Sequence, residues 1–190
     1  MTSNKMLGAL LFNIVSNICK SLIYNSMVEQ IQKFREYLDY IEEHYNNVQK
    51  AWKLLQEKCK NMNFIYDDAL FFELDAQIKQ HDLSKLSAEE FTQYRQFFFP
   101  AEKEEKDRAL FMEAWEHHKV NNDHHWQIWT MEGFGKSKQE LALIHNIVDW
   151  VAMGFKFNDT AKKYYEKNKE EIQFPKWAID YMYEIFELIY

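Results

Sequence analysis

Residues 28–60 read VEQIQKFREYLDYIEEHYNNVQKAWKLLQEKCK, a stretch with neither glycine nor proline. Apolar and aromatic side chains recur in it three or four residues apart, at Ile31, Phe34, Leu38, Ile41, Tyr45, Val48 and Trp52. That spacing places them on one face of an α-helix. The stretch therefore predicts a long helix over about residues 28–60, ended by the polar run from Asn61 to Asn63.

The composition extends this prediction to the whole chain. Only 4 glycines and 2 prolines occur in 190 residues, too few for the many turns of a sheet protein of this length. Apolar residues make up 47% of the chain, enough to build a substantial core. We expect an all-α, single-domain bundle of about seven or eight helices.

Local start and stop signals divide the rest of the chain into helices. Ser87 with Glu90, and Ser137 with Glu140, have the spacing of capping boxes that open helices. Pro175 suits the first turn of the last helix. The predicted helices cover about 67–82, 87–99 (ended by Pro100), 101–130, 137–155, one capped by Asn158 or Asp159, and 176–190.

Residues 1–27 predict an amphipathic helix that precedes the main domain, residues 28–190. Its apolar positions have helical spacing: Leu7, Leu10, Leu11, Ile14, Ile18 and Leu22. The segment is too short and polar to span a bilayer and has no signal-peptide cleavage site. We expect it to pack on the body or on a partner chain, with a membrane-surface helix as the alternative. The aromatic C-terminal helix is compatible with a homodimer interface or with packing inside one chain.

The net charge of −7 argues against general nucleic-acid binding, because affinity for phosphate backbones comes from clustered Lys and Arg. Only a local basic pocket for a small anion is compatible with it. Cys19 and Cys59 form neither a disulfide framework nor a metal-binding spacing. Free cysteines and eight methionines suit a reducing compartment, so we expect a cytoplasmic protein.

His81 and Asp82 form an adjacent nitrogen and oxygen donor pair at a predicted helix end, within the sequence H-D-L-S-K. Histidine and carboxylate are ligands that divalent transition metals use. Lys85 lies three residues beyond Asp82, so a helical turn brings it to the same side. An ammonium group there is well placed to hold a phosphate oxygen. The simpler alternative is a surface ion pair between Asp82 and Lys85.

Two further positions are candidate ligands from other helices. His44 lies on the apolar face of the long helix, where a hydrogen-bonded core histidine is the simpler interpretation. Asp149 lies in the apolar run I-V-D-W-V-A-M, and a carboxylate is costly to bury unless it is paired or bound to a cation. His145, one turn before Asp149, suits a supporting or core role better than ligation.

The segment A-W-E-H-H-K-V-N-N-D-H-H-W at 114–126 holds four histidines in nine residues. On a continuous helix, His118, Asn122 and His125 share one face, and His117, Asn121 and His124 form the neighbouring stripe. We expect one stripe to face a pocket and the other to face solvent or support the first. Lys119, Asn122 and Trp126 are candidate substrate contacts. Phe97 to Phe99 are further candidates, for which core packing explains as much.

The order of His44, His81-Asp82, further histidines and Asp149 resembles the His-Asp (HD) superfamily of helical metal-dependent phosphohydrolases. The resemblance implies that His44, His81, Asp82 and Asp149 hold a divalent ion (Mn, Co, Mg, Fe or Zn). The H-D-x-x-K form is similar to the branch whose lysine, here Lys85, contacts the scissile phosphate. Members with two metals add histidines between the His-Asp pair and the last Asp. His118 and His125 match those positions, although their spacing of seven residues departs from the family pattern.

The chain also resembles an uncharacterised family of phages and bacteria. Its motifs here are H-D-L-S-K, E-F-x-x-Y-x-x-x-F-F-P, A-W-x-x-H-K-x-x-N-x-H-H-W and D-W-x-A-M, within residues 43–157. This resemblance implies no activity. It implies a bacterial cytoplasm, or that of the host if the protein is phage-encoded.

Three functions follow as hypotheses. The first is hydrolysis of a small phosphoester, such as a nucleotide or nucleotide-derived signal. In it Lys85 neutralises the phosphoryl oxygens, and His118 or His125 binds a second metal or protonates the leaving group. The second is an HD-type oxygenase with two irons. The third is a non-catalytic protein that sequesters a nucleotide or a partner.

Overall fold

The computed structural model describes the backbone of residues 2–190 and the side chains of residues 15, 16, 20, 23, 24 and 26–190. Over these residues the chain is all-α, as predicted, with nine α-helices, one short 3₁₀ helix and no strand. The elements are α1 (Thr2–Lys58), α2 (Asn63–Tyr66), α3 (Asp68–Lys79), η1 (Leu83–Leu86), α4 (Phe91–Phe98), α5 (Arg108–Asn121), α6 (Trp126–Trp129), α7 (Lys136–Phe157), α8 (Ala161–Asn168) and α9 (Lys176–Ile189).

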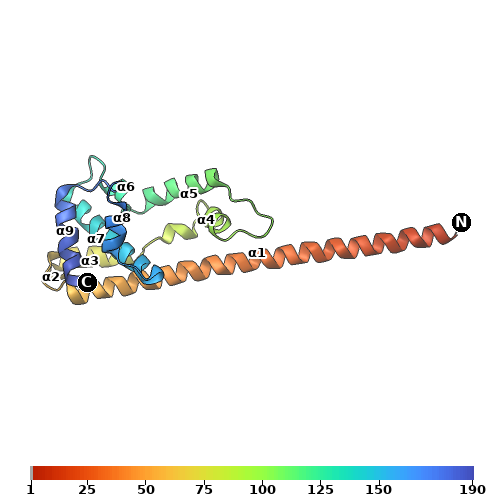
Figure 1. Ribbon diagram of the computed structural model, residues 1–190, viewed down its shortest axis with the longest axis horizontal. Coiled ribbons are helices and arrows are strands. Elements are labelled where there is room, and N and C mark those ends of the chain that lie inside the picture. Colours follow the sequence, from red (N-terminus) through yellow and green to blue (C-terminus); the bar gives the residue numbers. More distant parts are fainter. Residues whose placement is uncertain (1) are drawn as a thin grey trace.

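Helix α1 is one continuous element of 57 residues, so the predicted separate helix over residues 1–27 is wrong. At 1.5 Å per residue it spans about 85 Å. Neither glycine nor proline occurs between residues 9 and 99, so no helix breaker separates the two predicted segments. Figure 1 shows the other helices gathered around the C-terminal part of α1, while its N-terminal part extends away from them.

The N-terminal part of α1 exposes apolar side chains where they are described. Ile23, Tyr24 and Met27 are 70%, 66% and 58% exposed. The side chains of the predicted apolar stripe (Leu7, Leu10, Leu11, Ile14, Ile18 and Leu22) lie outside the described residues. Across the part of the chain that is described, no helix combines the length and apolar character needed to cross a bilayer.

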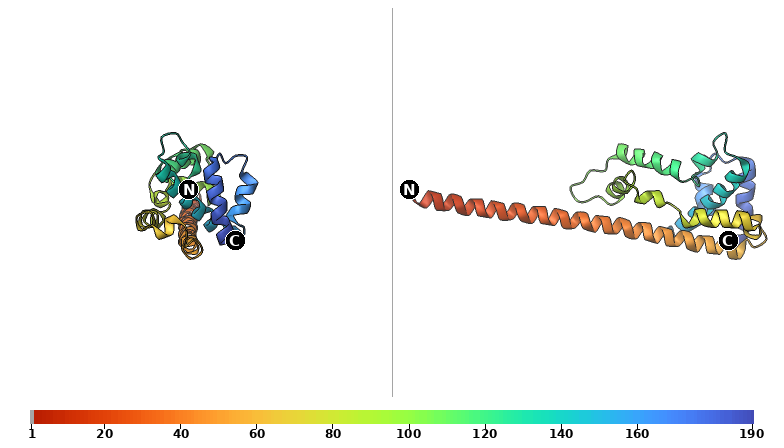
Figure 2. Two further views of the ribbon diagram at one scale, coloured as in Figure 1. Left: turned by 90° about the vertical axis from the view of Figure 1, so that its left-hand side faces the viewer. Right: turned by 180° about the vertical axis from the view of Figure 1, so that it is seen from behind.

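Helix α7 is the central element of the bundle and packs against α1, α3, α6, α8 and α9. Every residue from Leu141 to Val148 is buried, including His145 and Asn146. A helix that is buried on all sides has apolar residues at nearly every position. This burial explains the apolar sequence I-V-D-W-V-A-M in which Asp149 lies. The view from behind in Figure 2 shows α3 beside the C-terminal part of α1, which closes the bundle on that side.

The C-terminal helix packs inside the chain. Met182, Ile185 and Phe186 of α9 are fully buried, and the Tyr190 hydroxyl accepts a hydrogen bond from the backbone N–H of Ala161. Trp177, Tyr181 and Tyr183 pack against the same core. Packing within one chain therefore explains this aromatic helix, and the homodimer stays a prediction.

The predicted helix over 101–130 is wrong at both ends. Residues 101–107 are not helical: Glu104 instead pairs with the buried guanidinium of Arg95, and Asp107 caps α5. Helix α5 ends at Asn121, because the backbone of Asn122 turns to φ −136° and ψ 91°. Its side-chain amide donates to the carbonyl of His118 at 2.7 Å. His124 and His125 therefore leave the helix that carries His118.

The two predicted capping boxes are also wrong. Ser87 ends η1, and Glu90, the residue before α4, makes no capping hydrogen bond. Helix α7 follows Gly135 rather than a serine cap, and the Glu140 carboxylate accepts instead from the Asn63 amide. The side chains that do cap helices are Asp67, Asp107 and Thr160.

The cap predicted for α8 is displaced by one or two residues. Thr160 caps α8, and Asn158 ends α7 in the left-handed conformation, which asparagine tolerates better than most residues. Pro175 directly precedes α9, in agreement with the predicted start of the last helix.

Replacing Phe186 with alanine tests the importance of the α9 core. Phe186 is fully buried, so Phe186→Ala leaves a cavity and should lower the free energy of unfolding by about 3–5 kcal/mol. Leu188→Ala on the same helix is the matched control, because Leu188 is 43% exposed. Urea denaturation measures both, and equal losses would contradict the packing of α9.

Candidate metal centre

Four side chains from three helical regions converge at the centre of the bundle. His44 comes from α1, His81 and Asp82 from the junction of α3 and η1, and Asp149 from α7. The junction is sharp because Asp82 adopts a left-handed backbone conformation, with φ 55° and ψ 22°. An Asp tolerates this conformation better than most residues do, so the chain can leave α3 and still direct both side chains of the His-Asp pair inward.

The distances between the donor atoms match those around a shared ion. His44 Nε2 lies 2.9 Å from His81 Nε2, 3.5 Å from Asp82 Oδ2 and 3.3 Å from Asp149 Oδ1. His81 Nε2 lies 3.2 Å and 3.8 Å from the same two carboxylate oxygens. Ligands about 2.1 Å from one ion lie about 3.0 Å apart in an octahedron and about 3.4 Å apart in a tetrahedron. His44, His81 and Asp82 therefore form a group that suits one divalent ion, and Asp149 lies next to both histidines.

The electrostatics of this group favour a bound cation. Burial opposes protonation of His44, but hydrogen bonds with Asp149 and Asp82 outweigh it and raise its pKa to about 9. Burial disfavours the charged Asp149, but the hydrogen bond and charge of His44 hold its pKa well below the usual range. In the metal-free chain a proton on His44 thus balances the buried carboxylates, and a divalent ion can replace it.

Lys85 completes this side of the site. Its ammonium group is buried and lies 2.5 Å from Asp82 Oδ2. Burial alone would lower the pKa of Lys85, but the charge of Asp82 raises it, so the lysine stays cationic. The surface ion pair considered from sequence is therefore wrong, because both partners are buried.

The other oxygen of Asp82 faces a second group of donors. Asp82 Oδ1 is buried without a hydrogen-bond partner, 3.3 Å from His118 Nε2 and 3.6 Å from His124 Nε2. The Nε2 atoms of His124 and His125 are likewise buried without partners. Donor atoms of Asp82, His124 and His125 all lie within 4.8 Å of one another. Unsatisfied donors and acceptors this close together fit a second ion that shares Asp82 with the first.

His124 was missed as a candidate ligand from the sequence. The prediction placed it on a helical stripe beside His117, yet the chain turns at Asn122 and directs His124 inward, where it is 2% exposed. His117, which stays on the helix, is partly exposed. The sequence does indicate this turn, because Asn122 and Asp123 are residue types that favour helix ends and turns.

Glu90 orients the histidine that faces Asp82 Oδ1. Its fully buried carboxylate accepts hydrogen bonds from His118 Nδ1 at 2.8 Å and His117 Nδ1 at 2.7 Å. Burial would raise the pKa of Glu90, but the bonds from His118 and His117 lower it. With its proton on Nδ1, His118 presents Nε2 to the site, the arrangement that carboxylates impose on metal-bound histidines.

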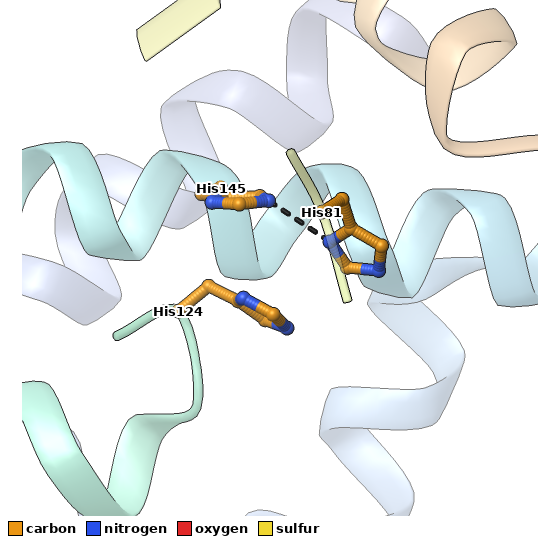
Figure 3. A group of neighbouring side chains, drawn as sticks. All are labelled: His81, His124 and His145. Atoms are coloured by element: carbon orange, nitrogen blue, oxygen red, sulfur yellow. Dashed lines mark hydrogen bonds between the residues drawn. The ribbon is translucent and has the colours of Figure 1, made fainter. Parts of the chain in front are cut away.

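His145 contacts the Nδ1 atom of His81, as Glu90 contacts the Nδ1 atom of His118. His145 Nε2 lies 2.9 Å from His81 Nδ1, on the side of His81 away from the carboxylates, and His124 lies next to the pair (Figure 3). Burial and the neighbouring His81 lower the pKa of His145 to about 3, so it stays neutral and its Nε2 can accept a hydrogen bond from His81 Nδ1. Donor atoms of His81, His124 and His145 also lie within 4.8 Å of one another, so His145 is itself a candidate ligand, and the supporting role expected from its sequence position stays a prediction.

The predicted substrate contacts divide into two groups. Trp126 lines a cavity of about 370 Å³ beside the donor atoms, together with His118 and His125. Lys119 does not line it: the ammonium pairs with Glu116 and lies 5.5 Å from the centre of the Trp115 ring. Asn122 braces His118 and Ser84 from behind. Phe97 to Phe99 also lie outside the cavity: Phe97 and Phe98 pack on Phe111 of α5, and Phe99 packs on Tyr37 and Tyr40 of α1.

The chain belongs to DUF5662. The family model matches residues 33–186, is described as a family of unknown function, and covers every candidate ligand. No curated protein and no solved structure matches the chain. The comparisons therefore place the site inside a shared family domain and carry no activity over to it.

The metal-free DUF5662 protein should be most stable near pH 6.5. His44 keeps its proton to about pH 9 when folded but to about pH 6.5 when unfolded, so its contribution is full below pH 6.5 and is lost as pH rises through 9. Buried His125 and His145, with pKa values of about 4 and 3, stay neutral when folded, so unfolding is favoured as pH falls below 6.5. Urea midpoints between pH 4.5 and 9.5 measure this.

His44→Asn is the control for the alkaline side of that profile, which it should flatten. Saturating Zn²⁺ should flatten it in the unmodified protein as well, because the ion replaces the proton. A midpoint that does not change between pH 6.5 and 9 in the metal-free protein would contradict the raised pKa of His44.

Glu90→Gln should weaken metal binding without unfolding the bundle. An amide cannot accept from His117 and His118 at once, so His118 loses its fixed orientation. We expect the affinity for Mn²⁺ or Fe²⁺ to fall by about 10- to 100-fold in calorimetric titrations. Glu116→Gln on α5, whose side chain is 61% exposed, is the matched control. Unchanged affinity would show that Glu90 has no part in metal binding.

Proposed function

We propose that this protein is a divalent-metal-dependent phosphohydrolase that acts on a small phosphoester, with a nucleotide as the favoured substrate class. The observation that carries the proposal is the convergence of His44, His81, Asp82 and Asp149 beside a buried, cationic Lys85. That combination places an anion-binding group next to donors that fit a metal, at the edge of a cavity.

A metal held by these residues would supply a polarised phosphoryl oxygen and a bound water of lowered pKa. Two side chains of the protein, Lys85 and His118, would bind the phosphoryl group and supply a proton. Lys85 is fixed by Asp82 and lines the cavity, so its ammonium is positioned to bind the oxygens of a phosphoryl group. His118 also lines the cavity, and its interactions with the Asp82 and Glu90 carboxylates outweigh its burial and raise its pKa. In the absence of a second ion, His118 is therefore a proton donor for the leaving group.

A second candidate function is the di-iron oxygenase. The observation in its favour is the second donor group, in which Asp82 Oδ1 faces His118, His124 and His125. Two irons that share Asp82 would use all these donors together with the first group. The hydrolase remains the first choice because Lys85, an anion-binding group, lines the cavity beside them.

The test is to purify the protein without chelators, measure its metals, and assay phosphate release from a set of phosphoesters with Mn²⁺, Co²⁺ or Mg²⁺. Asp149→Asn and His81→Ala should each lower turnover by at least about 100-fold, because each removes a metal ligand. Asp180→Asn is the control, since the Asp180 side chain is 63% exposed on α9.

Three outcomes would contradict the hydrolase. Turnover that survives both ligand substitutions would place the chemistry elsewhere. Two irons per chain with oxygen-dependent turnover would favour the oxygenase. Tight nucleotide binding without turnover under all three metals would favour a sequestering protein.

A further inference from the structure

We infer that the cavity selects a nucleoside monophosphate over nucleoside di- and triphosphates, and that Asn146 recognises the base. This inference deepens the proposed function and rests on it. It is carried by two properties of the cavity wall, its charge and its unpartnered polar atoms.

The charged side chains that line the cavity can neutralise little phosphate. Lys85 is the one lysine or arginine among the described residues of the wall, and Asp82 already binds it. In the proposed function a metal occupies Asp82 and Asp149, which leaves Asp159 as a carboxylate of the wall without an assigned cation. Polyphosphate sites typically use several cationic or N–H donors to hold successive phosphates. One phosphate beside Lys85 and the metal fits this wall, whereas further phosphates would find no other lysine or arginine among its described residues and would add to the negative charge of Asp159.

The nearest other lysines do not supply the missing charge. Lys119 is paired with Glu116 and lies over the ring of Trp115. Lys156 is paired with Glu43 and lies over the ring of Tyr40. Trp115 and Tyr40 line the cavity, whereas Lys119 and Lys156 do not, and each of these ammonium groups is paired with a glutamate. Both lysines are therefore neutralised before a ligand arrives.

The rest of the wall suits a planar, uncharged group that forms hydrogen bonds. Large aromatic side chains dominate it: Tyr40, Tyr94, Trp115, Trp126, Trp150, Phe157 and Tyr164. Asn146 is 2% exposed, lines the cavity, and its Oδ1 has no hydrogen-bond partner. Gln127 Oε1 and the Tyr94 hydroxyl line it in the same unpartnered state.

Those unpartnered atoms define the chemistry of the ligand. A buried amide oxygen without a partner is unfavourable until an N–H group reaches it. Nucleobases carry N–H groups on an aromatic ring, so they satisfy the amide oxygens and stack on the indoles together. Asn146 lies one turn before Asp149 and Trp150 on α7, which sets the base-binding amide beside the metal-binding carboxylate.

The experiment compares the 5′-mono-, di- and triphosphates of the same nucleosides, by phosphate release with the activating metal and by quenching of tryptophan fluorescence on binding. We expect the monophosphate to exceed the triphosphate by about 10-fold or more in kcat/KM and in affinity. Equal or better use of the triphosphate would overturn the inference.

Asn146→Leu and Gln127→Leu test the base-binding wall separately. Each should weaken nucleoside monophosphate binding by about 3- to 10-fold, the effect of one hydrogen bond, and leave the affinity for inorganic phosphate unchanged. Equal losses for phosphate and nucleotide in both variants would show a merely structural role and overturn the assignment.

Failure of the inference is distinguishable from failure of the proposed function. If phosphoesters without a base are hydrolysed as efficiently as the nucleoside monophosphates, the hydrolase stands and the inference falls. If the monophosphate binds preferentially and no phosphate is released with any metal, the specificity stands and the hydrolase falls.

Discussion

The structure depends on two carboxylates, the buried Asp82 and the partly buried Asp149, at the point where α1, α7 and the end of α3 meet. Carboxylates this buried are tolerated only when cations or hydrogen-bond donors compensate them. His44, His81 and Lys85 do so from elements distant in sequence. The surrounding apolar core, with Val48, Ile144 and Ile147 fully buried, holds the helices close enough for this compensation. Packing and electrostatics therefore specify the same arrangement of side chains. In that arrangement a proton on His44 balances the carboxylate charge, and a divalent ion can take the place of the proton.

The histidines of the site share one principle of construction, because an imidazole has two nitrogens and each can have a separate task. His81 directs Nε2 toward the carboxylates and Nδ1 toward His145. His118 directs Nε2 toward Asp82 and Nδ1 toward Glu90. The supporting partners differ, a neutral imidazole in one case and a carboxylate in the other. Carboxylate support makes a histidine a stronger donor than a neutral imidazole does, so the two halves of the site have different electronic character.

The fold class was predictable from sequence, because it depends on local helical spacing. The set of His44, His81, Asp82 and Asp149 comes from the resemblance to the HD superfamily. The structure brings the four side chains together, and metal binding by them stays a prediction. Helical spacing identifies buried faces, and an Asp in an apolar run signals a compensated charge. The second donor group was only partly predictable, since it depends on where α5 ends. A helix continued past Asn121 carries His124 away from His118. The turn at Asn122 brings His124 inward instead, and Glu90, predicted as a cap, supports His118. Single-residue differences at helix ends decide such sites, and spacing rules resolve them least well.

The position of Lys85 connects the two halves of the site to the cavity. Its ammonium group is held by Asp82 Oδ2, while Asp82 Oδ1 faces the second group of histidines. One carboxylate therefore fixes Lys85 and lies next to both donor groups. Under the proposed function, a phosphate would meet an ammonium whose side-chain freedom is already lost, so little further ordering would oppose binding. The aromatic side chains and Asn146 line the same cavity. In that proposal, the part of the ligand beyond the phosphate would govern selectivity, because the charged end of the site is committed before the ligand arrives.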